Sequence, residues 1–518
     1  MRGHRQRILV SVATAATLLL TACGGGGDTD DGSAPAGEPV RGGAFELTTG
    51  IDFQTLDPAR CGVNPNWGGC QAVFGTLMDY DPEAQELVPG MAEDFTSEDG
   101  REWTLRLREG VTFSDGTPFD SAAVIANWDR ARDPRILSSA LPILETMTYE
   151  AVDPRTVRVT LDETNWAMAW ALNIQLAFIG SPTALAQRGQ DFGNAPVGAG
   201  PFTLTEWSRG TRMQLDRNPT YWDQPRPYLD SLAFVPNPSE EQRLNALRAD
   251  EVTMMLTLTK EIADRGVRDG FVDHPLEQLG GVGMLLSARN EPTADPDVRR
   301  AIALLVDTRQ ISEAVLGGDT PATTFAREGT ALYDAEARYP GPDVAAAQAL
   351  VDGYRQRSGV GEVVLSYKMI PGVPREERLA QLLQSQMQRA QGMRVDIEPV
   401  EISAFVDDIR QGNYDLIQAS VNGVNPDEMY SLFHTDGSTN GMGYSNPQTD
   451  AALERARTTQ DPQQRLEAYR EATRHVSADI VQLPFRYNTS HLLSRDTVHD
   501  VQPSFSYFFR SERVWMEQ

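Results

Sequence analysis

The stretch PVGAGPFTLTEWSRGTRMQLDRNPTYWD, residues 196–223, carries the pattern that decides the fold. Residues 198–201, Gly-Ala-Gly-Pro, predict a tight turn, because glycine tolerates positive φ and proline presets φ. Two short strands follow over residues 202–207 and 212–217, and the loop 208–210 joins them as a hairpin. Met213 and Leu215 alternate with polar residues, which predicts one buried and one wet sheet face. Asn218 and Pro219 then end the second strand.

The length and composition limit the class of protein. A chain of 518 residues is too long for one hydrophobic core, so we expect two or three lobes. With 40% hydrophobic and 23% charged residues the composition is that of an ordinary globular protein. The net charge of −27 argues against nucleic acid as a partner, because phosphate binding needs clustered Lys and Arg.

The first residues have the pattern of an export signal. Three arginines precede an apolar run over residues 8–20, and Leu20-Thr21-Ala22-Cys23 matches a bacterial lipobox. We expect a signal peptide over 1–22 and a flexible linker over 23–40, tethered by a diacylated Cys23 to the outer face of the cytoplasmic membrane. The alternatives are a signal peptide with a chance cysteine, or a signal anchor. No other apolar run is long enough to span a membrane.

Two further cysteines, Cys61 and Cys70, stand nine residues apart. An even pair in an exported protein is most simply a disulfide that closes the loop between them. Metal binding is the alternative, and it lacks a nearby His or third Cys.

Catalytic motifs are missing at usable places in the sequence. There is no nucleophile elbow, zinc-protease motif, phosphate-binding loop or dinucleotide fingerprint, and the six His are scattered. We therefore expect no enzyme, no cofactor and no metal. A secreted hydrolase stays as an alternative from another class, although its nucleophile and base cannot be placed.

Several motifs occur in a familiar order. The hairpin stretch reads like "GxGPYxLxxW…rNpxYW", residues 55–59 (TLDPA) like "tLDPa", residues 111–119 (VTFSDGTPF) like "vkFhDGtplta", and residues 295–308 like "d.rvRqAiayAiDr". Taken together, this order resembles the family 5 extracytoplasmic solute-binding proteins of ABC importers, which include oligopeptide, dipeptide and nickel binders. The resemblance runs over nearly the whole chain after the linker.

The resemblance implies an α/β, periplasmic-binding-protein-like fold of two lobes (class II, cluster C type) joined by two crossings, with an inserted β-rich subdomain in the first lobe. It places the first lobe at 41–57, 178–283 and 485–518, the inserted subdomain at 58–177, and the second lobe at 284–484. Within the second lobe, strands at 362–368, 394–400 and 414–420 alternate with helices, which predicts parallel pairing. We expect Gly392 to end the first of these helices and Ser403 to cap the next.

A ligand is expected beyond the carboxyl ends of these parallel strands, facing loops of the first lobe. Trp67 in the cysteine-closed loop is either an exposed wall for the ligand or a residue packed into the first lobe. Asp427 either supplies a charge to the ligand or caps the following helix. The residues that we expect at the site are, in the first lobe, Phe53, Gln54, Asn66 and Trp67 and, in the second lobe, Lys368, Ser420, Asn422, Asn425 and Asp427.

Two positions depart from what the resemblance implies for peptide binders. Asn422 stands where those proteins place the Asp that pairs a peptide's α-ammonium, and Ile370 stands where dipeptide binders place an Arg for its carboxylate. A neutral amide cannot supply the charge-assisted bond, which contributes roughly 1.5–3 kcal/mol. Lys368 could substitute for the Arg as a point charge, or could be a surface lysine.

The function that follows is capture of a small solute between two closing lobes and its delivery to a membrane permease. By family frequency the solute is a peptide, and the alternative is a non-peptide such as an opine, sugar or metal chelate. A surface interaction lipoprotein without a transported ligand is a third possibility. The expected partners are the ligand, the ABC permease and ATPase subunits and, through the lipid alone, the membrane; the protein itself is expected to be a monomer.

Overall fold

The computed structural model describes residues 37–62, 66–421, 424–504 and 507–517. The predicted signal peptide, the lipidation site Cys23, most of the predicted linker and Asn422 lie outside these residues. Within them, none of the helices combines the length and the apolar character that a membrane crossing needs.

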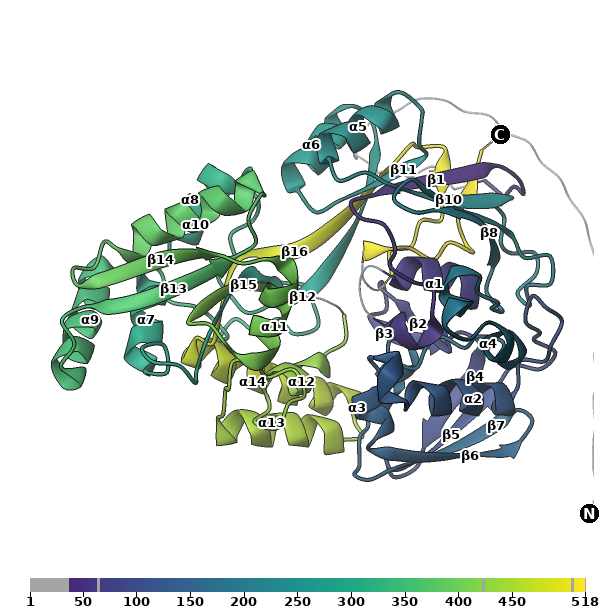
Figure 1. Ribbon diagram of the computed structural model, residues 1–518, viewed down its shortest axis with the longest axis horizontal. Helices are drawn as coiled ribbons and strands as arrows, with labels where there is room; N and C mark the ends of the chain where they lie inside the picture. The colour runs from purple at the N-terminus through teal and green to yellow at the C-terminus, as the bar shows by residue number, and fades with distance from the viewer. Residues whose placement is uncertain (1–36, 63–65, 422–423, 505–506, 518) are drawn as a thin grey trace, which may run out of the picture. The chain divides into compact units, whose positions relative to one another are not determined.

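The largest sheet has ten strands in the order β14-β13-β15-β12-β16-β11-β1-β10-β9-β8. Its central strands β12 and β16 are long and pair with each other antiparallel, and Figure 1 shows them running together between two groups of elements. We call the group with β1 and β8–β11 the first lobe, and the group with β13–β15 the second lobe. The ten strands are β1 Ala44–Thr49, β8 Phe202–Ser208, β9 Arg212–Arg217, β10 Ser231–Pro236, β11 Met254–Thr257, β12 Val272–Leu286, β13 Val363–Met369, β14 Met393–Pro399, β15 Leu416–Ser420 and β16 Gln482–Ser494.

The two crossings are these central strands, and they are longer than the sequence pattern indicated. The apolar runs near 283–290 and 480–484 predicted short crossing segments, whereas β12 already begins at Val272 and β16 continues to Ser494. Toward the second lobe β12 pairs with β15, and toward the first lobe β16 pairs with β11. The lobes are therefore joined by an antiparallel ribbon whose register shifts between Glu277 and Gly281 and again between Val282 and Gly283.

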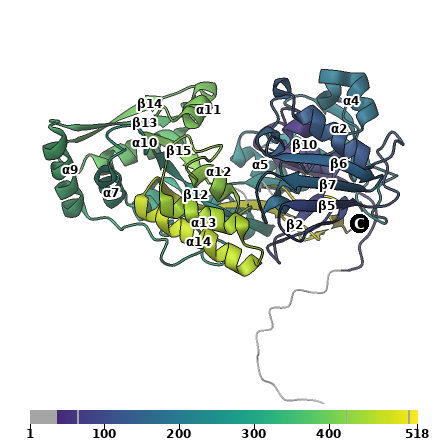
Figure 2. The ribbon, with the colours of Figure 1, turned by 90° about the horizontal axis from the view of Figure 1, so that it is seen from below.

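The first lobe also contains a separate four-stranded antiparallel sheet in the order β4-β5-β7-β6. Helix α2 packs on this sheet (Figure 2), where Trp128 and Val124 join one buried cluster with Leu105. The strands are β4 Ala92–Ser97, β5 Glu102–Leu107, β6 Met147–Asp153 and β7 Thr156–Leu161, with smaller pairs β2 Met78–Asp81 with β3 Glu86–Pro89, and β17 Val498–His499 with β18 Trp515–Met516.

Helices and short 3-10 turns surround these sheets. The helices of the first lobe are α1 Trp67–Phe74, α2 Ser121–Ala131, α3 Leu141–Leu144, α4 Pro182–Arg188, α5 Glu240–Arg248 and α6 Lys260–Arg268, with 3-10 turns η1 Pro58–Arg60, η2 Pro134–Ile136, η3 Met168–Leu172 and η4 Gly189–Asn194. Those of the second lobe are α7 Pro296–Leu305, α8 Thr308–Val315, α9 Val344–Ser358, α10 Pro374–Met387, α11 Ile402–Gln411, α12 Glu428–Phe433, α13 Pro447–Thr458 and α14 Pro462–Asp479.

The signature hairpin forms as predicted, but its glycines serve a different purpose. Strands β8 and β9 pair antiparallel, and Met213 and Leu215 are fully buried. Neither Gly198 nor Gly200 has positive φ. A Cβ on Gly198 would stand 2.1 Å from the carbonyl oxygen of Val73, and one on Gly200 would stand 2.6 Å from the carbonyl carbon of Val73. The two glycines let the hairpin backbone lie directly on α1.

The second lobe has the predicted parallel strands, since β13 pairs parallel with both β14 and β15. Three local predictions were wrong. Helix α10 ends at Met387, and Gly392, with φ 81°, instead turns the chain into β14. Helix α11 starts after an extended Glu401, which makes Ser403 part of its first turn rather than its cap. In the first lobe the helix predicted over 71–78 is shifted, because α1 already begins at Trp67 and Met78 belongs to β2.

Candidate functional site

Three hydrogen bonds among the described residues join the lobes besides those of the crossing strands. Arg375 Nη1 at the start of α10 donates to Thr259 Oγ1 after β11, at 3.2 Å. The backbone N–H of Trp166 donates to the carbonyl oxygen of Arg457 at the end of α13, at 2.7 Å. Gln85 Nε2 donates to the carbonyl oxygen of Gly329 at 3.2 Å. These polar contacts between separately folded groups lie where a hinge motion would make or break them.

Thr259 is held in place by Glu240, the first residue of α5. Its Oγ1 donates to Glu240 Oε2 at 2.6 Å, and Thr257 Oγ1 donates to Glu240 Oε1 at 2.7 Å. Burial alone would raise the pKa of Glu240, but the hydrogen bonds from Thr259, Thr257 and the Leu258 N–H together hold this pKa below its usual value. The carboxylate therefore stays charged and orients the hydroxyl that faces Arg375.

Arg375 is also bound within its own lobe. Its Nε and Nη2 donate to Glu376 Oε1 at 3.1 and 3.0 Å, and Glu376 Oε2 accepts a hydrogen bond from Gln418 Nε2 on β15 at 2.5 Å. Arg486, at the centre of β16, pairs with Asp319 at 3.3 Å and is buried. Sequence reasoning missed all of these residues. Only the position of Arg375, at the start of a helix that follows a parallel strand, could have suggested it.

Lys368 lies on β13 near its carboxyl end, as the sequence predicted, but its charge is already paired with a carboxylate of the same lobe. Its Nζ donates to Asp408 Oδ2 at 2.8 Å and to the carbonyl oxygen of Asn413 at 2.6 Å, and its side chain is 16% exposed. Lys368 therefore links β13 to α11 within the second lobe.

Asp427 neither caps the helix that follows nor offers an unpaired charge. Its carboxylate accepts two hydrogen bonds of 2.8 Å from Nε and Nη2 of Arg457, and a third of 2.7 Å from the Tyr469 hydroxyl. The helix α12 has no side-chain cap. Burial alone would lower the pKa of Arg457, but the Asp427 charge raises it above its usual value. Arg457 also lies 3.4 Å from the centre of the Tyr430 ring.

The other predicted residues of the second lobe lie around the end of β15. Ser420 is the last residue of that strand and is exposed. Asn425 is buried, and its Oδ1 accepts the backbone N–H of Asp427 at 2.9 Å, which closes a local turn. Lys368, Ser420, Asn425 and Asp427 are thus gathered at the carboxyl ends of adjacent strands and the loop that follows.

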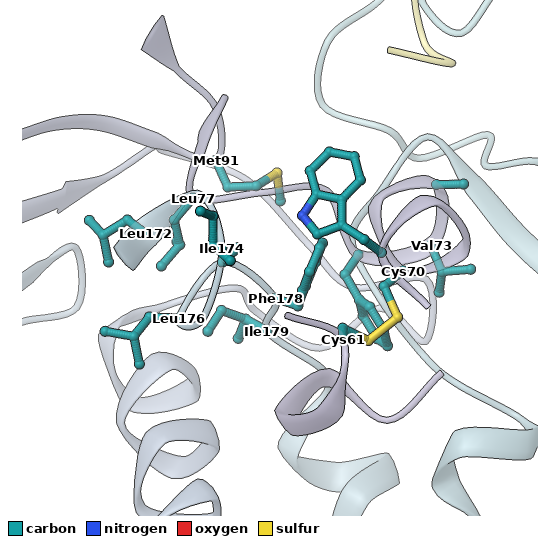
Figure 3. Packing of buried hydrophobic residues seen from close by; sticks show 14 of the residues in the cluster. Cys61, Cys70, Val73, Leu77, Met91, Leu172, Ile174, Leu176, Phe178 and Ile179 are labelled. Carbon is teal, nitrogen blue, oxygen red and sulfur yellow. A yellow bond between two sulfur atoms is a disulfide. The ribbon is translucent and has the colours of Figure 1, made fainter. Parts of the chain in front are cut away.

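Trp67 packs into the first lobe, so the exposed alternative was wrong. Its side chain is fully buried, at the start of α1, with its ring centre 6.0 Å from that of Phe178. The predicted disulfide between Cys61 and Cys70 is confirmed, and Figure 3 shows it packed among apolar side chains that include Phe178. The disulfide and the indole therefore belong to the core that positions the neighbouring loop.

In the loop before the disulfide, a buried residue is followed directly by an exposed one. Phe53 is buried against Phe234 and Phe508, with ring centres 4.8 and 5.9 Å away. Gln54 is exposed. Asn66 is buried, and its Oδ1 accepts the backbone N–H groups of Gln54 and Thr55 at 2.8 and 3.3 Å. Of the residues predicted here, Gln54 is the one whose side chain is free to reach a ligand, and Phe53 and Asn66 hold its backbone.

A residue from the C-terminal segment also reaches the crossing strands. The Tyr507 hydroxyl accepts from Asn488 Nδ2 at 3.4 Å, and Asn488 donates to Gln278 Oε1 at 3.1 Å. Tyr507 has φ 77°, a conformation that side chains other than glycine rarely adopt. Such backbone outliers concentrate at functional sites. Nothing in the periodicity of the C-terminal segment indicated this residue.

Comparison with known proteins places this architecture in a class. The structure of H. pylori DppA in complex with the peptide STSA matches with a TM-score of 0.80 and 21% identity, covering 92% of this chain and 99% of that one. The structure of AgaA from A. tumefaciens R10 with agropinic acid matches with a TM-score of 0.79 and 23% identity over 92% and 99%. The fold is therefore the two-lobed α/β fold of periplasmic binding proteins.

The sequence comparisons give the family. The profile of bacterial extracellular solute-binding proteins, family 5, matches residues 86–443. The periplasmic murein peptide-binding protein MppA of E. coli K12 is 27% identical over 441 residues, which span 78% of this chain and 80% of that protein. The chain belongs to the family 5 extracellular solute-binding proteins, and the predicted family and fold class are confirmed. It acts as the solute-binding component of an ABC import system, outside the cytoplasm.

Proposed function

We propose that the solute is a peptide, bound between the lobes beyond the carboxyl ends of β13, β14 and β15. The observation that supports this most is the ribbon of β12 and β16, which joins the lobes while α10 of one touches the β11 loop of the other through Arg375 and Thr259. A ligand that contacts both lobes stabilises the closed arrangement by its differential affinity. The similar proteins MppA and DppA bind peptides, and the choice of a peptide as the solute of this chain rests on that similarity.

A non-peptide solute is the second candidate. The charged groups that a peptide's free ends would use are engaged inside this protein: Lys368 with Asp408, and Asp427 with Arg457. The similar AgaA fold holds agropinic acid, which is not a peptide. In this alternative, the same fold binds an opine-like compound or another small organic solute.

The proposal also covers the membrane anchor, the oligomeric state and the absence of catalysis. A diacylated Cys23 anchors the protein to the outer face of the cytoplasmic membrane, the folded part acts as a monomer, and it carries out no chemistry on its ligand. Mass spectrometry of the protein purified from membranes would detect the lipid on Cys23. Replacing Cys23 with Ser would release the protein into the soluble fraction.

Thermal unfolding with a ligand panel tests the solute. A ligand that binds the folded state at 100 times its Kd stabilises it by about 2.7 kcal/mol, so binding raises the unfolding midpoint. Peptides of two to five residues, opines and sugars form the panel. A rise with peptides alone supports the proposal, and a rise with non-peptides alone favours the second candidate. Chemical turnover of any bound compound would contradict a transport role.

A further inference from the structure

The charges at the second lobe's strand ends are matched within the protein. Four ion pairs surround this region, at distances between 2.8 and 3.3 Å: Lys368–Asp408, Asp427–Arg457, Arg375–Glu376 and Arg486–Asp319. To bind a charged ligand group, one of these side chains would have to leave or share its partner. Breaking such a pair leaves an uncompensated charge behind, so the arrangement disfavours charged ligand ends.

Three of the side chains exposed near the same strand ends are aliphatic. Val373, the residue before α10, is 41% exposed, and Ile402 and Val406 on α11 are 64% and 54% exposed. Ile402 and Val406 are four residues apart and share one helix face. We call these three residues the aliphatic patch. The carboxylates beside it, Glu377 and Glu401, are exposed, so an ion pair with either would contribute little.

The patch lies at the junction with the first lobe. The loops that carry Val373 and Ile402 follow the adjacent parallel strands β13 and β14, where the N–H of Val400 donates to the carbonyl oxygen of Met369 at 2.9 Å. Two residues after Val373, Arg375 makes its hydrogen bond to Thr259 of the first lobe. Val373 is therefore two residues from a direct contact between the lobes, and the patch follows the strand ends where open α/β sheets bind ligands.

The first lobe exposes an apolar side chain of its own. Ile51 follows β1 and is 61% exposed. Its neighbour Gly50 lies against Arg243, since a Cβ there would be 3.5 Å from Arg243 Nη1. Arg243 pairs with Glu240, which holds Thr259. Arg243 thus packs beside Gly50, and polar contacts lead from Arg243 through Glu240 and Thr259 to Arg375.

From this arrangement we propose that the site selects solutes with a branched aliphatic or aromatic group and needs no charged end on them. The group lies between Ile51 and the aliphatic patch, and closure removes all of these side chains from water. This inference rests on the proposed function and names the class of peptide that the site takes. Burial of one such group is expected to tighten binding by about tenfold or more.

Calorimetric titration of the purified protein with four peptides tests this inference. The probes are trialanine and trileucine, each with free ends and with acetyl and amide blocks. We expect trileucine to bind at least tenfold more tightly than trialanine, and blocking to change either affinity by less than about threefold. Equal affinities for the two sequences, or a loss above tenfold on blocking, would overturn the inference while leaving peptide binding in place. Failure of all four to bind would contradict the proposed peptide function itself.

Variants of two patch residues and of one control residue test whether the patch contacts the ligand. Val373→Ser and Ile402→Ser are expected to weaken trileucine binding at least fivefold each and to leave trialanine unchanged. The control is Val360→Ser: Val360 is also 41% exposed, but it precedes β13 and lies at the opposite, amino-terminal end of that strand. All three positions are exposed, and far-ultraviolet circular dichroism verifies that each variant keeps the fold. If the two patch variants behave like the control, the patch does not contact the ligand.

Discussion

The guanidinium of Arg457 forms a two-pronged ion pair with the carboxylate of Asp427, with both hydrogen bonds at 2.8 Å. The two residues come from different helices, since Asp427 directly precedes α12 and Arg457 lies near the end of α13. The carbonyl oxygen of Arg457 also accepts the N–H of Trp166 from the first lobe. The pair therefore fixes the loop after β15 and the rim of the second lobe that touches the first.

Replacing Asp427 with Asn tests how much this pair contributes to stability. The change leaves the Arg457 charge without its partner in a site where the two side chains are 25% and 13% exposed. We expect a loss of about 2–3 kcal/mol in the free energy of unfolding, somewhat below the cost of breaking a fully buried pair. Urea denaturation monitored by circular dichroism measures it. As a control, Asp396→Asn breaks a pair with Arg394 whose side chains are both 47% exposed, and should cost under about 1 kcal/mol.

The same pair illustrates what the sequence could and could not indicate. Asp427 and Arg457 are 30 residues apart, and only the packing of α12 against α13 brings them together. Local reasoning saw Asp before a helix and offered two roles for it, a charge for the ligand or a cap, and it forms neither. The choice between an exposed and a packed Trp67 could not be made for the same reason, because the Phe178 ring against which it packs comes from a distant part of the chain. The alternation over residues 212–217 predicted β9 to the residue, because alternation is a local property.

The glycines before the signature hairpin give a second prediction. Gly200 needs its missing side chain for space, since a Cβ would meet the carbonyl carbon of Val73 at 2.6 Å and the backbone nitrogen of Gly75 at 2.7 Å. Gly200→Ala should therefore destabilise the protein by roughly 2–4 kcal/mol, as overpacking against rigid backbone does. Gly210, in the hairpin loop, has φ 71° and nothing near its Cβ position, so Gly210→Ala should cost only about 1 kcal/mol of backbone strain. Comparable losses for the two variants in thermal unfolding would contradict this explanation.

Glu428 predicts a dependence of stability on pH. Burial, with a smaller effect of the Asp427 charge, raises the pKa of Glu428 from 4.5 to about 8. The folded state thus keeps a proton that the unfolded state has already lost, so stability falls as pH rises from about 4.5 to 8. Because the side chain is only partly buried by surface area, we expect a loss of about 1–2 kcal/mol across that window.

The variant Glu428→Gln should remove that part of the pH dependence. It carries no titrating proton, so it should match the wild type near pH 5 and exceed its unfolding free energy by about 1–2 kcal/mol at pH 8. Chemical denaturation at both pH values measures the difference. Replacing the exposed Glu398 with Gln is the control. A gap between Glu428→Gln and the wild type that does not grow with pH would show that Glu428 is ionised in the folded protein.

The contact between Arg375 and Thr259 should affect ligand affinity more than folding. Thr259→Val removes the hydroxyl that accepts from Arg375, and with it one hydrogen bond between the lobes. A hydrogen bond to a charged group contributes about 1.5–3 kcal/mol at most, and less where water competes, so we expect a three- to tenfold weaker Kd. The matched control is Thr257→Val, which also loses a bond to Glu240 but does not touch Arg375. Titration of both variants with a bound peptide, together with small-angle scattering of lobe closure, separates the two effects. Equal losses of affinity in the two variants would mean that Glu240, rather than the contact between the lobes, determines binding.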